Sequence, residues 1–215
     1  MKKIIYFFEF LLVEFLFIIC KIIGYKSASN LGFFIGKNFG NFFRKKKSII
    51  ENLHKSRIAI NIPDNQFVNN ILGNYGRILA EYPFLKDFRK DKLEHFIKID
   101  GIENLDKIKS NKKPVVFISG HFNNFELMAM QIEKHGINLA AIYRPLNNIF
   151  LNKTMERIRT KYICRNQIRK GRSGTRQILE NLKKGNSIAL MIDQRVTEGI
   201  KIDFFGNLAS TTTIP

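Results

Sequence analysis

The stretch VVFIS at residues 115 to 119, followed at once by GHFNNFE at residues 120 to 126, decides the fold. A short apolar run rich in β-branched residues predicts a buried strand, and the residues after it open a helix at about 123 to 135. The same alternation continues with strands at 139 to 144 and 187 to 193, helices at about 149 to 162 and 175 to 184, and a loop at RKGRSGT. Apolar strands alternating with helices predict an α/β fold with a mainly parallel central sheet flanked by helices.

Two elements are expected upstream of this core. Asp64 is suited to cap a helix that runs to Pro83, and the alternating residues FIKID at 96 to 100 read as another strand. A chain of 215 residues has room for one sizeable core, so we expect one main domain.

A histidine directly after a buried strand suggests a catalytic site at the end of that strand. In a parallel sheet the carboxyl ends of the strands face the ligand crevice, and His121 lies two residues past VVFIS. A neutral imidazole there can take a proton from an incoming hydroxyl. Glu126 is expected in the first turn of the next helix, where its carboxylate is favoured by the helix dipole and could orient the imidazole.

Other strand ends carry polar residues that would meet His121 at one crevice. Arg144 ends a predicted strand that we place beside the one carrying His121, and Asp193 and Gln194 end a third. Residues 144 to 176 carry ten basic residues against only Glu156, which would form a positive rim for phosphates or an acidic protein.

The sequence gives little support for a serine nucleophile or for metal catalysis. Ser119 lacks the Gly-x-Ser-x-Gly elbow of serine hydrolases. The chain contains no His-Glu-x-x-His and no cysteine pair, since Cys20 and Cys164 are its only cysteines, so neither a metal site nor a disulfide framework is indicated.

Charge and apolar patterning indicate an acidic partner and a membrane. The chain has 36 Lys and Arg against 18 Asp and Glu, a net charge of +18, part of which a biased genome composition would also explain. Residues 4 to 20 are apolar except for Glu9 and Glu14. Their apolar residues favour insertion by roughly 4 to 8 kcal/mol, which two central acids nearly cancel, so spanning the bilayer and lying in its interface both stay open.

A basic segment follows the apolar run. Residues 37 to 57, including RKKK at 44 to 47, carry seven basic residues and only Glu51 as an acid. Such a cluster beside an apolar helix is typical of a segment that binds anionic headgroups, although a solvated helix face would show the same pattern of basic residues.

Five motifs follow one another along the chain: GHFNNFE (120 to 126), YRPLNN (143 to 148), LKKG (182 to 185), MIDQ (191 to 194) and FFG before a threonine run (204 to 213). In these motifs the chain resembles the lipid A biosynthesis acyltransferases, within the lysophospholipid acyltransferase superfamily. The resemblance implies that His121 is the general base with Glu126 as its partner. Arg144, Asn147, Asp193 and Gln194 would then bind substrate or order the site.

The resemblance also implies the reaction and its place. A fatty acyl chain would move from acyl carrier protein to a hydroxyl of a lipid A precursor, without a cofactor, a metal or a covalent intermediate. The enzyme would be anchored to the anionic inner membrane with its site facing the cytoplasm, and it would bind no nucleic acid. We expect residues 1 to 24 to be the anchor, 25 to 95 a helical basic segment, and 96 to 215 an acyltransferase core that is incomplete at its C-terminal end.

Alternative readings remain. A glycerolipid acyltransferase would more often carry Asp at position 126 and a Phe-Pro-Glu-Gly-Thr-Arg segment after a strand, whereas GRSGTR (171 to 176) precedes a predicted helix. A non-enzymatic, membrane-tethered module that binds RNA or lipid is permitted by the charge, but it does not explain the three strand ends.

Overall fold

The computed structural model describes residues 1–42, 46–193 and 199–211 and divides them into two compact units. The first unit contains Met1–Phe15 and Phe84–Asp193, and the second contains Leu16–Pro83 together with residues 199–211. The long helix α1 (Lys2–Ile23) contributes to both.

A four-stranded parallel sheet forms the centre of the first unit. Its strands lie in the order β1 (Val116–Ser119), β4 (Ser187–Met191), β2 (Leu139–Tyr143) and β3 (Asn166–Arg169). Ser119 pairs with Met191, and Ala189 pairs with Ala141, so β1, β4 and β2 end level with one another. The predicted α/β fold with a parallel sheet is therefore confirmed.

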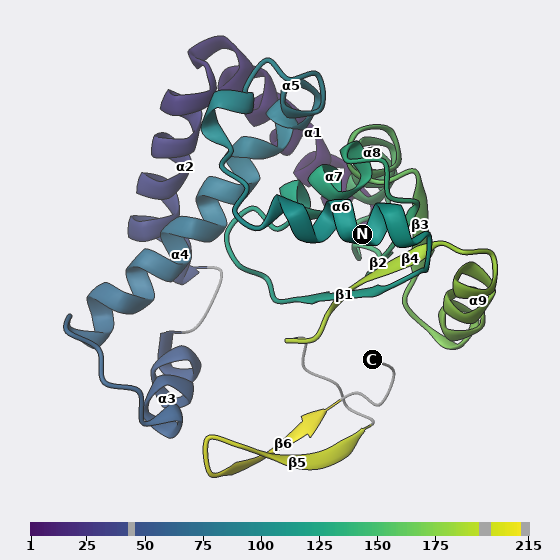
Figure 1. Ribbon diagram of the computed structural model, residues 1–215. Coiled ribbons are helices and arrows are strands. Elements are labelled where there is room, and N and C mark those ends of the chain that lie inside the picture. The colour runs from purple at the N-terminus through teal and green to yellow at the C-terminus, as the bar shows by residue number, and fades with distance from the viewer. Residues whose placement is uncertain (43–45, 194–198, 212–215) are drawn as a thin grey trace. The chain divides into compact units, whose positions relative to one another are not determined.

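Helices cover both faces of this sheet (Figure 1). One face carries α6 (Ile102–Asn111), α7 (Glu126–Lys134) and α8 (Ile149–Ile158), and the other carries α9 (Arg172–Lys183). Ile178 and Leu182 of α9 pack on a core of Ala140, Ile168, Ile188 and Leu190. The unit is completed by the π-helical turn η4 (Arg159–Ile163) after α8 and by α5 (Leu85–Arg89) and η3 (Glu94–Phe96), while η2 (Tyr82–Phe84) joins it to the second unit.

The order of the strands corrects one prediction. We expected the strand before Arg144 to lie beside the strand before His121, but β4 lies between β2 and β1. With strands about 4.8 Å apart, the two ends are separated by roughly 10 Å. The direct neighbour of His121 is therefore the end of β4, which leads to Asp193.

The predicted strand at residues 96 to 100 is wrong. Phe96 ends the short helix η3, and the residues that follow have no regular structure. Phe96 and Ile99 are exposed. An alternating pattern is not enough for a strand, because a strand also needs a neighbour to accept its backbone hydrogen bonds.

The second unit is built on a close helix pair. Helix α2 (Tyr25–Phe39) packs on α4 (Asp64–Glu81) so tightly that a Cβ on Gly76 would lie 2.1 Å from the backbone oxygen of Gly32. Buried Glu81 accepts a 2.7 Å hydrogen bond from Ser29 across the pair. The other elements of this unit are η1 (Gly40–Phe42), α3 (Lys46–Ser56) and the antiparallel hairpin of β5 (Ile200–Phe204) and β6 (Asn207–Thr211).

The start of α4 differs slightly from the prediction. Pro63 occupies the N-cap position, and Asp64 is the first helical residue. The Asp64 carboxylate lies 2.6 Å from the His54 ring instead of capping the helix with its side chain.

No helix in the described ranges is both long enough and apolar enough to cross a membrane, which does not support a transmembrane helix at residues 4 to 20. Of the basic motif RKKK, Arg44 and Lys45 lie outside the described residues. The expected binding of this segment to headgroups stays a prediction.

Candidate active site

His121 and Asp193 meet where β1 and β4 end. The pairing of the two strands continues past their last residues, because the Ile192 amide donates a 3.0 Å hydrogen bond to the Ser119 carbonyl. Two residues beyond each strand, Asp193 accepts two hydrogen bonds from His121. The backbone amide donates to Oδ2, and ring Nδ1 donates to Oδ1, each at 2.7 Å. One carboxylate thus fixes both the main chain and the side chain of His121.

This contact fixes the tautomer of the imidazole. An ionised carboxylate only accepts hydrogen bonds, so Nδ1 carries the proton and Nε2 of the neutral ring carries the lone pair. Partial burial raises the pKa of Asp193, but the hydrogen bonds from the His121 amide and ring outweigh it, and the net pKa lies below the ordinary value. Asp193 is therefore ionised at neutral pH, which the assignment of the His121 tautomer requires.

The site is open to a substrate. The side chain of His121 is 28% exposed and that of Asp193 is 45% exposed. The edge of the Phe125 ring supports the imidazole, with the ring centres 4.7 Å apart. Exposed apolar side chains flank the pair, among them Phe122, Ile192, and Ile118 on β1. A proton acceptor beside exposed apolar side chains can serve a substrate that has an apolar part.

The glycine before His121 is required by the closeness of Asp193. A Cβ added to Gly120 would lie 3.0 Å from the Phe122 ring and 3.2 Å from Asp193 Oδ2. We therefore expect Gly120→Ala to displace the carboxylate by a few tenths of an ångström and to lower kcat by roughly 10- to 100-fold with the fold intact. Steady-state kinetics beside a thermal melt would measure this. Ser119→Ala is the matched control, because Ser119 donates to the Gly120 carbonyl and its loss leaves Asp193 in place. Equal kinetics for both variants would contradict the steric role.

Glu126 lies in the first turn of α7, as predicted, and is buried. Its Oε1 accepts hydrogen bonds from Nε and Nη2 of Arg159 on η4, at 2.8 and 2.6 Å. Arg159 in turn lies over the ring of Tyr143, the last residue of β2. The Glu126 carboxylate thus joins α7 to η4 behind the site, and its predicted role as the partner of the imidazole stays a prediction.

The remaining predicted site residues lie farther along the same edge. Arg144 and Asn147 follow β2 and are exposed, so both are open to a ligand. Gln194 lies outside the described residues. Of the ten basic residues between 144 and 176, at least three are paired with acids inside this unit, namely Arg159 with Glu126, Arg169 with Glu156 and Arg176 with Glu180.

Sequence reasoning missed the role of Asn148. This buried side chain caps α8 by accepting from the amides of Phe150 and Leu151, and it donates to the carbonyl of Tyr6 and to the carboxylate of Glu9. Its cap position could have been inferred, because asparagine before a helical run is a favoured N-cap. The residues that it contacts on α1 lie 142 and 139 positions earlier in the chain, and no local sequence pattern predicts such a contact.

An imidazole at one strand end, held by a carboxylate at the next, is an arrangement that general-base catalysis uses. In the described parts of the chain, no group of His, Cys, Asp and Glu is arranged to hold a metal ion.

The whole chain, residues 1–215, matches the family model of the bacterial lipid A biosynthesis acyltransferases, and the protein belongs to this family. A comparison with curated proteins found no match. The chain is therefore an enzyme with transferase activity, and the family's substrates are a lipid A precursor and an acyl donor.

Proposed function

We propose that this protein transfers a fatty acyl chain from acyl carrier protein to a hydroxyl of a lipid A precursor, with His121 as the general base. The observation that carries the proposal is the double contact of Asp193 with His121, found in a chain of this family. It leaves Nε2 as the proton acceptor at an open strand end.

The chemistry needs no enzyme nucleophile. The acceptor hydroxyl loses its proton to His121 Nε2 as its oxygen attacks the thioester carbonyl, and Asp193 stabilises the imidazolium that forms. The carbon–sulfur bond then breaks, and the imidazolium returns the proton to the leaving thiolate. The products are an ester and the free thiol of the carrier. Arg144 and Asn147, exposed at the same edge, would bind phosphate or polar groups of the acceptor or donor.

The site would face the cytoplasm at the inner membrane, where the acceptor lipid and the carrier meet. Incubating the protein with acyl carrier protein charged with a fatty acid and with a tetra-acylated lipid A precursor tests the reaction, with the product read by mass spectrometry. A gain of one acyl chain on the precursor is expected. Acylation of lysophosphatidate alone would overturn the proposal in favour of a glycerolipid acyltransferase.

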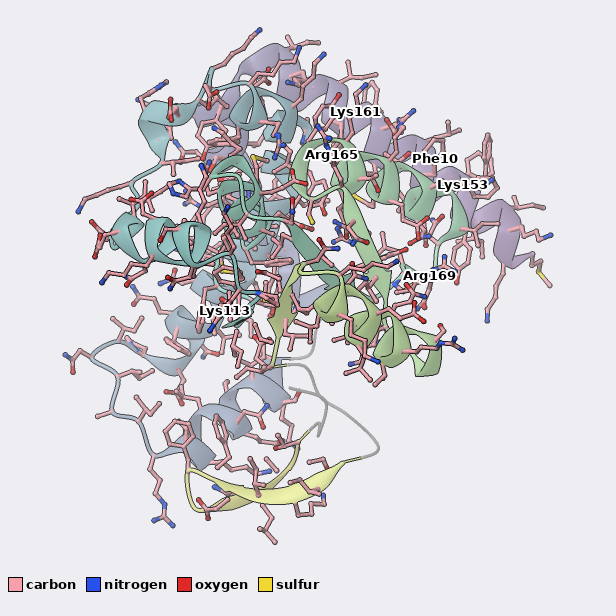
Figure 2. All side chains as sticks on the ribbon, turned by 45° about the vertical axis from the view of Figure 1, so that its right-hand side comes forward. Phe10, Lys113, Lys153, Lys161, Arg165 and Arg169 are labelled. Carbon is pink, nitrogen blue, oxygen red and sulfur yellow. The ribbon has the colours of Figure 1, made fainter. Side chains whose placement is uncertain are left out.

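A row of exposed basic residues is a suitable dock for the acidic carrier. Lys153 and Arg157 on α8 and Lys161 on η4 follow one another at intervals of four residues, and Arg165 comes four residues later. Figure 2 shows Lys153, Lys161 and Arg165 along α8 and the turn that follows it. We call these four residues the basic row. An acidic protein attracted to it would be steered to the helices beside the strand ends.

Replacing Lys153, Arg157 and Lys161 by Gln should raise the KM for the acyl carrier protein substrate roughly tenfold at low salt, because each exposed charge contributes at most about 1 kcal/mol. The effect should shrink at high salt, and kcat should hold. Exposed Lys107 on α6 and exposed Lys183 and Lys184 at the end of α9, replaced together by Gln, provide a control with the same charge change. An equal rise of KM in the control would show that only net charge matters.

A further inference from the structure

We propose that helix α1 binds an anionic bilayer by lying in the plane of the bilayer surface with one apolar face inserted. The helix does not cross the bilayer. This outer face consists of Ile4, Ile5, Phe8, Leu11, Leu12 and Phe15. The inference rests on the membrane location proposed above and specifies the surface that makes the contact. It does not depend on the catalytic chemistry.

The outer face is a continuous apolar stripe. Ile4, Phe8 and Phe15 are 62, 64 and 60% exposed. A residue of an α-helix lies about 100° from the one before it, so all six residues fall within a sector of roughly 120°. An exposed apolar stripe of this size on a helix marks an interaction surface.

The acidic residues of α1 lie outside this stripe. Glu9 accepts a 2.9 Å hydrogen bond from the Asn148 side chain at the start of α8, and Oε1 of Glu14 is shielded from solvent. Phe7 and Phe10 pack on Phe150 of α8, with ring centres 5.6 and 6.1 Å apart, and Figure 2 labels Phe10 on this helix. If α1 spanned the bilayer, both acids would enter the hydrocarbon. If α1 lies in the plane of the surface, Glu9 keeps its hydrogen bond from Asn148.

Charge favours a bilayer as the occupant of the outer face. Lys2 and Lys3 begin the helix and Lys21 lies in its last turn, where long side chains can reach anionic headgroups while the stripe enters the acyl region. A second copy of this chain would bring another +18 charges against the first, which opposes self-association.

This placement has a consequence for the site. Asn148 donates to the Tyr6 carbonyl at 2.8 Å as well as to Glu9, and it lies four residues after Arg144. The Leu146 amide also donates to the Asn152 side chain at 2.9 Å, which fixes the turn between β2 and α8. A helix in the membrane surface would therefore hold the segment that carries Arg144 at a set depth below the headgroups of the acceptor lipid.

The chain contains no tryptophan, so a single introduced one reports its own depth. The experiment uses Ile4→Trp and Phe15→Trp on the outer face, and Phe10→Trp on the side of α1 that packs on Phe150. Each variant is mixed with vesicles of phosphatidylcholine and phosphatidylglycerol in which the phosphatidylcholine is brominated at a shallow or a deep chain position. Quenching of the tryptophan fluorescence gives the depth, and co-sedimentation gives the binding.

Both outer-face tryptophans should be quenched alike, by the shallow bromines more than by the deep ones, and the tryptophan at position 10 should be quenched weakly. A spanning helix would separate the depths of residues 4 and 15 by roughly 16 Å, and that result would overturn the inference while leaving the membrane location intact. Strong binding without quenching of either outer tryptophan would also overturn it, in favour of binding through other basic surfaces. Failure to bind the vesicles would overturn the membrane location as well. Acyl transfer to precursor dispersed in detergent tests the proposed reaction separately.

Discussion

His121→Ala is expected to lower acyl transfer by at least roughly 10²- to 10⁴-fold, because it removes the proposed proton acceptor. The side chain lies in a strand-end loop and is 28% exposed, so its loss opens no core cavity, and the fold and membrane binding should stay near normal. The rate of thiol release from charged acyl carrier protein, with the acceptor saturating, measures the effect. Circular dichroism and a thermal melt check the fold.

Asp193→Asn separates the two parts of this mechanism. The amide keeps the size of the carboxylate but cannot stabilise the imidazolium in the same way, so the rate should fall strongly without reaching the His121→Ala level. Turnover of His121→Ala comparable to the original enzyme would place the base elsewhere. An acyl group trapped covalently on the protein, with Ser119→Ala inactive, would contradict direct transfer.

The sequence predicted His121 and Asp193 as site residues for a sound physical reason, since both follow apolar runs and parallel strands end at one edge. It did not predict that they touch. Strand order depends on which helices cross which face of the sheet, and no local pattern records that β4 inserts between β1 and β2. For the same reason Arg144 was placed one strand too close to His121.

Predictions from short sequence patterns were wrong or incomplete where contacts with distant parts of the chain determine the structure. The strand β3 (Asn166–Arg169) was not predicted, and most of it falls between the helix expected at about 149 to 162 and the loop RKGRSGT. It is four residues long and only Ile168 in it is buried, so its pattern is weak. FIKID had the alternation of a strand but no neighbour. From the sequence alone, Glu9 is a charge that opposes membrane insertion. Only the structure shows that its carboxylate accepts a hydrogen bond from the Asn148 side chain.

Glu126→Ala is expected to lower the free energy of unfolding by about 3 to 5 kcal/mol, because it leaves the Arg159 guanidinium without its carboxylate in a largely buried setting. The two side chains are 8 and 15% exposed, and both Arg159 contacts converge on one oxygen. Urea unfolding monitored by circular dichroism gives the change. Arg159→Met combined with Glu126→Leu should recover much of the stability, since replacing both side chains leaves neither charge buried. A Glu126→Ala protein as stable as the original would contradict this role of the ion pair.

The same variants test the role that sequence analysis gave Glu126. In the stabilised double variant the fold is kept while the carboxylate is gone, so its rate per folded molecule reports on catalysis alone. If Glu126 orients the imidazole, the rate should stay roughly 10²-fold or more below the original despite the recovered stability. If Glu126 serves only to hold η4 on α7, the rate should return with the stability, and Asp193 would then be the carboxylate on which the imidazole depends.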